Sequence, residues 1–120
     1  MRIDVKRCAE LLREQDNILI LTHAHPDGDT LGSGFALCRA LMALGKNARV
    51  INADEIPKKY DYLYKDLSFA DFKETYVVAV DVATENLLGA FADVYGGKIN
   101  LCIDHHGTNT EYAENLLLIE

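Results

Sequence analysis

The chain carries a dense group of potential metal ligands near its N-terminus. His23, Asp27 and Asp29 fall within seven residues, directly after the apolar run of residues 18–21. Imidazole nitrogens and carboxylate oxygens suit a divalent transition metal such as manganese or zinc. Because the intervening proline and glycine are expected to interrupt any regular helix or strand, the three side chains can converge on one point. The segment therefore predicts a metal site.

Two later apolar runs end in the same kinds of side chain. Residues 75–80 are followed by Asp81, and residues 99–103 are followed by Asp104-His105-His106. Both runs are typical of strands buried on two faces. Because ligands bind at the carboxyl ends of the strands in an open α/β sheet, we expect these groups and the first one to meet at one edge.

Each group has a simpler interpretation when it is taken alone. Asp27 and Asp29 could flank a solvated turn, Asp81 could cap a helix, and the two adjacent histidines could form a surface pair. Four carboxylates at the mouth of one sheet would, however, repel one another and raise one another's pKa values unless cations offset the charge. Their joint occurrence favours a metal site.

Three further residues of the first segment could contact a substrate or support the ligands. His25 alternates away from His23, and the proline after it is expected to hold its backbone in an extended form. We therefore favour a supporting or substrate-facing role for His25 over metal ligation. Gly32 and Ser33 are expected to open the next helix, where free backbone N–H groups can hold an anion. Close packing of the helix on a strand explains Gly32 equally well.

The elements that must position these residues alternate along the chain. Helical periodicity predicts helices over residues 5–15, 31–45 and 84–95. Apolar runs predict strands over residues 17–21, 49–51, 75–80 and 99–103. Strands that alternate with helices predict an α/β domain with a mainly parallel sheet flanked by helices.

The segment between residues 54 and 72 has a different character. It contains Tyr60, Tyr62 and Tyr64, and it is expected to form short helices that cover the sheet edge. We interpret the tyrosines as packing residues rather than as a platform for stacking bases.

The length, net charge and apolar content of the chain limit the classes of function that it can have. A chain of 120 residues with a net charge of −7 is one small domain without the broad basic face that long nucleic acids require. Its apolar runs are about five residues long, far short of the roughly 20 that span a bilayer. Cys8, Cys38 and Cys102 are widely spaced and occupy apolar positions, so we interpret them as buried reduced thiols of a soluble, cytoplasmic protein.

The motifs together resemble those of the DHH phosphoesterases. The resemblance rests on three ordered segments: His23-x-x-Pro26-Asp27-Gly28-Asp29-x-x-Gly32-Ser33, Asp81 after an apolar strand, and Asp104-His105-His106-Gly107-Thr108-Asn109. It covers nearly the whole chain and implies a Rossmann-like DHH domain. The glycines and the serine are most similar to the branch of oligoribonucleases, 3'-phosphoadenosine 5'-phosphate phosphatases and RecJ-type exonucleases.

The resemblance implies two manganese ions, although other divalent ions are open alternatives. His23 and Asp27 would hold the first ion, Asp29 and His105 the second, and Asp81 would bridge the two. His106 would face the substrate phosphate and, with Asp81, would be catalytic. Asp104 and Asn109 would support the site or contact substrate.

The implied function is a manganese-dependent hydrolase of very short RNA or of 3'-phosphoadenosine 5'-phosphate, acting by a two-metal mechanism. A cyclic-dinucleotide phosphodiesterase and a RecJ-like single-strand exonuclease are alternatives of the same class. The acidic composition disfavours the exonuclease. A non-catalytic nucleotide-binding module is the alternative from another class.

The resemblance also implies that residues 1–120 are the N-terminal part of a truncated DHH domain. The family has a fourth motif with another metal-binding aspartate, followed by a smaller C-terminal domain that binds substrate, and neither matches a part of this sequence. The closing run, residues 116–119, is typical of a strand that lacks its following helix. A homodimer is a further expectation for the full-length protein.

Overall fold

One five-stranded, all-parallel sheet forms the centre of the protein. The computed structural model describes residues 1–120. The strands are β1 (Ile18–Leu21), β2 (Ala48–Ile51), β3 (Tyr76–Val80), β4 (Leu101–Asp104) and β5 (Asn115–Leu118). They lie in the order β2-β1-β3-β4-β5, and every neighbouring pair is parallel. The predicted α/β class with a mainly parallel sheet is confirmed.

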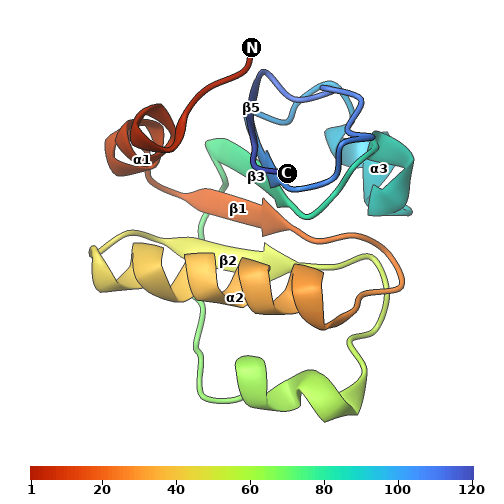
Figure 1. Cartoon of the computed structure of the whole chain (residues 1–120). Helices are drawn as coiled ribbons and strands as arrows, with labels where there is room; N and C mark the ends of the chain where they lie inside the picture. The colour runs from red at the N-terminus through yellow and green to blue at the C-terminus, as the bar shows by residue number, and fades with distance from the viewer.

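Three α-helices and two 3-10 helices accompany the sheet, and Figure 1 shows how the α-helices are arranged around it. They are α1 (Val5–Glu14), α2 (Gly28–Ala43), α3 (Phe91–Tyr95), η1 (Lys58–Leu63) and η2 (Glu85–Leu88). One buried cluster joins α1 and α2 to one face of the sheet, and a second lies on the opposite face with η2 and the segment after β4. The three cysteines are buried and free, as expected. None of the helices is long and apolar enough to cross a membrane.

The second helix begins earlier than the sequence pattern predicts. It starts at Gly28 rather than near residue 31, because the Asp27 side chain accepts a hydrogen bond from the Thr30 backbone N–H and so caps the first turn. The expectation that no helix passes through the ligand-rich segment is therefore wrong for its second half. Asp29 lies in the first turn of α2, where a negative charge is favourable.

The single helix predicted over residues 84–95 is also wrong, because Gly89 divides it into η2 and α3. Gly89 has φ +64° and ψ −135°, a conformation that side-chain-bearing residues rarely adopt. A Cβ at this position would lie 3.0 Å from the Ala24 side chain and 3.2 Å from that of Ala53. The chain bends here so that it can approach the loop after β1.

The segment after β2 packs against α2 and also contacts the edge strand β2, where the Arg49 guanidinium lies 4.5 Å from the centre of the Phe72 ring. The rings of Tyr64 and Phe35 stack with their centroids 5.4 Å apart, and Tyr60 and Leu63 also contact the core cluster on this side. Figure 1 shows η1 below α2 and β2. The interpretation of the tyrosines as packing residues fits Tyr60 and Tyr64, whereas Tyr62 is exposed.

The N-terminal segment covers the edge strand β5. The Ile3 N–H donates to the Leu116 carbonyl and the Leu116 N–H donates to the Met1 carbonyl, both at 2.9 Å. These bonds satisfy backbone groups that an open sheet edge would leave exposed.

Replacement of Gly89 by alanine should destabilise the protein by about 1–3 kcal/mol, because the new Cβ would adopt a strained conformation and crowd two alanine side chains. Urea-induced unfolding measures this loss. Gly97→Ala is the matched control: Gly97 has φ +75° but open space around the position of a Cβ. Equal losses in the two variants would contradict the role assigned to the contacts at Gly89.

Candidate metal centre

The sheet order places the carboxyl ends of three ligand-bearing strands side by side. β1, β3 and β4 are consecutive in the sheet and parallel. The residues that follow them, His23, Asp81 and His105, therefore project from one edge. Two groups of side chains able to hold a metal form at this edge, and Asp81 belongs to both.

The first group consists of His23, Asp27 and Asp81, whose ligand atoms lie within 4.8 Å of one another. His23 Nε2 is 3.6 Å from Asp27 Oδ1 and 3.8 Å from Asp81 Oδ2. His23 Nδ1 lies 2.8 Å from the Ala24 carbonyl, which can only accept, so Nδ1 carries the proton in the neutral ring. Nε2 then directs a lone pair toward two carboxylates. A cation between them satisfies all three groups, so this donor set fits a divalent metal.

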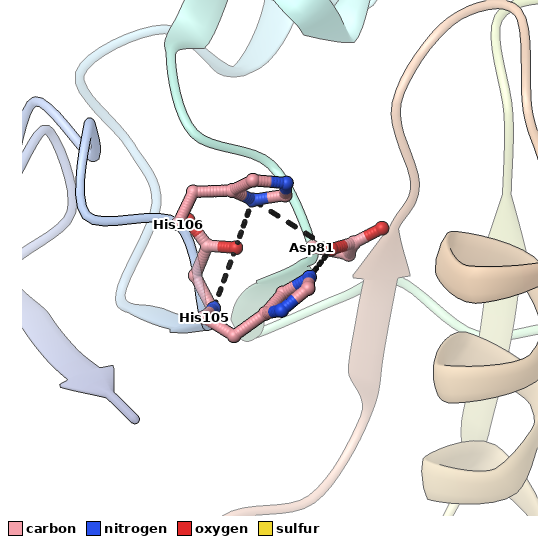
Figure 2. A group of neighbouring side chains, drawn as sticks. Asp81, His105 and His106 are labelled. Atoms are coloured by element: carbon pink, nitrogen blue, oxygen red, sulfur yellow. Dashed lines mark hydrogen bonds and ion pairs between the residues drawn. The ribbon is translucent and has the colours of Figure 1, made fainter. Parts of the chain in front are cut away.

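The second group consists of Asp81, Asp104, His105 and His106, whose ligand atoms also lie within 4.8 Å of one another. It forms around the other oxygen of the Asp81 carboxylate, since His105 Nε2 lies 2.8 Å from Asp81 Oδ1. Asp29 is outside this group, but its Oδ2 lies 3.1 Å from His105 Nε2. Figure 2 shows the imidazoles of His105 and His106 turned toward Asp81 from the loop after β4. Asp81 thus directs Oδ2 to the His23 side and Oδ1 to the His105 side. A carboxylate placed in this way can bridge two ions.

Asp81 is an unfavourable place for an uncompensated negative charge. The residue is 6% exposed. Burial raises the pKa of its carboxyl, the charge of Asp29 raises it further, and the hydrogen bond with His105 and the charge of His106 oppose the change. Its backbone has φ +62°, which points the side chain into the group instead of continuing the strand. The ionised Asp81 carboxylate is therefore electrostatically unfavourable in the metal-free protein, and a bound cation would offset this cost.

Asp104 is buried in the same way but is fully hydrogen-bonded. It accepts from the His105 backbone N–H at 2.8 Å and from Asn109 Nδ2 at 2.8 Å, and it lies 2.7 Å from His106 Nδ1. Burial acts to raise the pKa of its carboxyl, but these hydrogen bonds outweigh burial and lower it. The hydrogen bond to Asp104 raises the pKa of His106 in turn. Asp104 therefore orients His106, although it lies within 4.8 Å of the other ligand atoms.

His25 differs from the sequence expectation. Its backbone is not extended: φ is +53°, and the imidazole is 97% exposed. The Asp54 carboxylate compensates for the cost of this conformation, since Oδ2 accepts the His25 backbone N–H at 2.7 Å. His25 belongs to neither ligand group, and its substrate-facing role stays a prediction.

Gly32 and Ser33 do not open α2 but lie in its second turn, where backbone N–H groups bond within the helix. The expectation of an anion site on their N–H groups is therefore wrong. The alternative of close packing is also wrong, because no atom lies within 4 Å of the position of a Cβ at Gly32. The Ser33 side chain faces the cavity beside the metal centre.

A cavity of about 410 Å³ adjoins the second group. Its polar wall bears three carboxylates, an imidazole and a hydroxyl, and its apolar wall comes from α2, the sheet and the C-terminal segment. The lining residues are Asp29, Ser33, Leu37, Val80, Asp81, Ile103, Asp104, His105 and Ile119. A cavity of this size is in the range that holds small organic ligands.

The sequence analysis missed three residues that support the centre: Thr30, Asn52 and Asp54. Asn52 Nδ2 donates to the Thr22 hydroxyl at 2.6 Å and to the His23 carbonyl at 2.7 Å, and its Oδ1 accepts the Asp54 N–H. The sequence does contain a signal for Asn52 and Asp54, since both follow a strand as the other site residues do. Thr30 gave no such signal, because it lies inside a helix.

Fold and site together define an α/β domain with a candidate metal centre at the carboxyl edge of a parallel sheet. Residues 17–119 match the description "DHH family, N-terminal domain", and the chain belongs to the DHH family. The resemblance to the DHH phosphoesterases is confirmed.

Two relatives show how far the likeness extends. The chain is 40% identical over 111 residues to the bifunctional oligoribonuclease and PAP phosphatase NrnA of Thermus thermophilus, a match that covers 88% of this chain and 33% of that protein. An exopolyphosphatase-related protein from Bacteroides fragilis has the same fold, with a TM-score of 0.80 at 20% identity over 94% of this chain and 37% of its own. The chain therefore spans about a third of the length of these relatives.

Replacement of Asp81 by asparagine should stabilise the metal-free protein and abolish tight binding of divalent ions. Asparagine tolerates a positive φ as aspartate does, and it removes the buried charge that Asp29 opposes. We expect the melting temperature in EDTA to rise by roughly 2–5 °C. The sign follows from the raised pKa: the ionised carboxyl opposes folding increasingly as the pH rises above the value of about 4 that an unfolded aspartate has.

Thermal melts of both proteins in EDTA between pH 4 and pH 8 measure this effect. The advantage of the asparagine variant should be small at pH 4 and larger at pH 7. An Asp81→Asn protein that melts below the parent at pH 7 would show that the carboxylate stabilises the metal-free fold.

Proposed function

We propose that this chain supplies the two-metal centre of a manganese-dependent phosphoesterase that hydrolyses short oligoribonucleotides, 3'-phosphoadenosine 5'-phosphate, or both. The observation that carries the proposal is the sharing of the buried Asp81 carboxylate by two ligand groups. Identity of 40% to an oligoribonuclease and PAP phosphatase supports the choice of substrate. The further domain that binds substrate is proposed to follow residues 1–120 in the intact protein, which could also form a homodimer.

The carboxylates and imidazoles divide into two sets that meet at Asp81. In the proposal, His23 and Asp27 hold one ion, Asp29 and His105 hold the other, and Asp81 contacts both. Mixed nitrogen and oxygen donors fit manganese, although zinc and other divalent ions share this preference. Two bound ions would activate a water nucleophile and stabilise the charge that develops on the phosphoryl oxygens.

His106 is the proposed catalytic residue on the substrate side. Asp104 engages its Nδ1 at 2.7 Å, so Nε2 is left for a substrate oxygen. The same hydrogen bond raises the pKa of His106 in the metal-free protein. A protonated imidazole can donate a hydrogen bond to the phosphate and stabilise it in the transition state. Asp104 and Asn109 fix the ring for this task.

The size of the substrate follows from the charge of the site. Three carboxylates line the cavity, so a phosphate can approach only where metal ions or His106 offset them. The chain has 12 basic and 19 acidic residues and offers no excess of positive charge to track a long strand. One or two phosphate groups close to the ions are therefore the expected recognition element.

Replacement of His106 by asparagine should lower kcat on a diribonucleotide by about 100-fold or more while manganese still binds. Steady-state kinetics of the intact protein, with and without EDTA, and calorimetric titration of manganese measure the two properties. Normal turnover in the variant would exclude the catalytic role. Manganese binding by the parent protein without hydrolysis of any phosphoester would favour the non-catalytic nucleotide-binding module.

Cleavage by the intact protein should be fastest on strands of about two to five nucleotides and should fall with length, because this acidic domain offers no long phosphate track beside the site. Initial rates on a series of labelled oligoribonucleotides test this expectation. Equal rates on a dimer and on a strand of tens of nucleotides would support a RecJ-like exonuclease instead. A clear preference for cyclic dinucleotides would support the cyclic-dinucleotide phosphodiesterase.

A further inference from the structure

Thr30 is a buried polar residue at the point where the ligand-bearing segments meet. It lies in the first turn of α2 and is 0% exposed. Its hydroxyl donates to the Val80 carbonyl at 3.1 Å and accepts the His23 backbone N–H at 3.3 Å. Its own backbone N–H donates to Asp27 Oδ1 at 3.0 Å. Thr30 therefore contacts His23 and Asp27 directly, and Asp81 through the residue before it.

The Thr30 hydroxyl lies between the ends of β1 and β3. The paired register of β1 and β3 ends at Leu21↔Ala79. If that register continued, His23 would lie opposite Asp81, and the His23 N–H could bond directly to the Val80 carbonyl. The Thr30 hydroxyl joins these two groups instead. It thus takes the position of the next ladder hydrogen bond and separates the strand ends by one oxygen atom.

We propose that Thr30 is a positioning residue that spreads the ends of β1 and β3 and so sets the separation of His23 and Asp81. The separation matters because both residues would hold the same ion in the proposed function, on which this inference rests. His23 Nε2 and Asp81 Oδ2 lie 3.8 Å apart, too far for a direct hydrogen bond and close enough to share a cation. A hydroxyl fixed at both ends holds this spacing with little freedom.

Thr30 also bonds to Asp27, which both caps α2 and lies near His23. The Asp27 Oδ1 atom caps α2 through the Thr30 N–H and also lies 3.6 Å from His23 Nε2. A shift of Thr30 would therefore move the cap, the His23 backbone and the end of β3 together. Residues that orient metal ligands in this manner affect metal affinity without touching the ion.

Thr30→Val tests the inference, since valine keeps the size of the side chain and the backbone N–H but removes the hydroxyl. Manganese affinity of the intact protein should fall about 10-fold or more, as loss of a residue that orients ligands typically causes. Thr30→Ser, which keeps the hydroxyl, should stay within about threefold of the parent, because the interactions that orient the ligands are kept. Calorimetric titration of manganese into the metal-free protein gives both values independently of turnover.

Thr75→Val is the matched control. Thr75 immediately precedes β3, at the end of the strand opposite Asp81, and its hydroxyl donates to the Asp16 carbonyl at 2.9 Å. Removal of this hydroxyl should leave manganese affinity within about threefold of the parent, because it joins no ligand-bearing segments. An equal loss of affinity in Thr75→Val and Thr30→Val would overturn the specific role of Thr30.

Parent-like manganese affinity in Thr30→Val would overturn the inference and leave the proposed function intact. Absence of manganese binding in the parent protein would instead overturn the proposed function, and this inference with it. If the valine variant does not fold, Thr30→Cys replaces it, because a thiol of similar size is a much weaker hydrogen-bonding group. Its affinity should then lie below that of Thr30→Ser, and equal affinities would again contradict the inference.

Discussion

The buried carboxylate of Asp81 is the constraint on which the rest of the site depends. It is 6% exposed, it lies close to the negative charge of Asp29, and burial raises its pKa. An interior charge of this kind costs free energy unless an opposite charge compensates for it. The neighbouring imidazoles compensate for the Asp81 charge only in part, because each of them makes a single contact with the carboxylate. The group of side chains around Asp81 could hold a metal ion, and a cation bound there would offset this charge.

The parallel sheet explains how distant parts of the sequence reach this carboxylate. Parallel strands end at the same edge, and the order β1-β3-β4 puts three ligand-bearing ends next to one another. The N-terminus of α2 then adds Asp27 and Asp29 from one turn of helix. Asp27 serves as helix cap and as candidate ligand, so the start of the helix and the shape of the site are determined by the same side chain. Local capping and metal chemistry are thus coupled.

Much of the fold could be predicted because the strands are short, apolar and buried on both faces. β3 and β4 were recognised from such runs, and the polar residues that end them identified most of the proposed site. The errors have local causes. Gly28 was interpreted as a helix breaker, but the Asp27 cap outweighs its low helix propensity. Gly89 divides a continuous helical pattern through a close backbone approach that periodicity does not report.

The supporting residues were harder to predict because their roles depend on contacts between segments. His25 has a left-handed backbone that Asp54 compensates from another loop. Thr30 lies in the first turn of α2, and helical periodicity does not distinguish it from the other residues of that turn. Its hydroxyl gains a role only when β1 and β3 stand next to each other. Sequence patterns identify groups that end strands, and they do not identify groups that lie between strands.

The contrast between Asp81 and Asp104 shows how one residue type acquires two roles. Both follow or end a strand and are similarly buried, at 6% and 5% exposure. Hydrogen bonds from Asn109, His106 and the His105 backbone lower the pKa of Asp104, whereas burial and a neighbouring charge raise that of Asp81. Asp104 is therefore already compensated by the protein and can hold an imidazole in place. Asp81 is only partly compensated, so of the two carboxylates it has more to gain from a nearby cation.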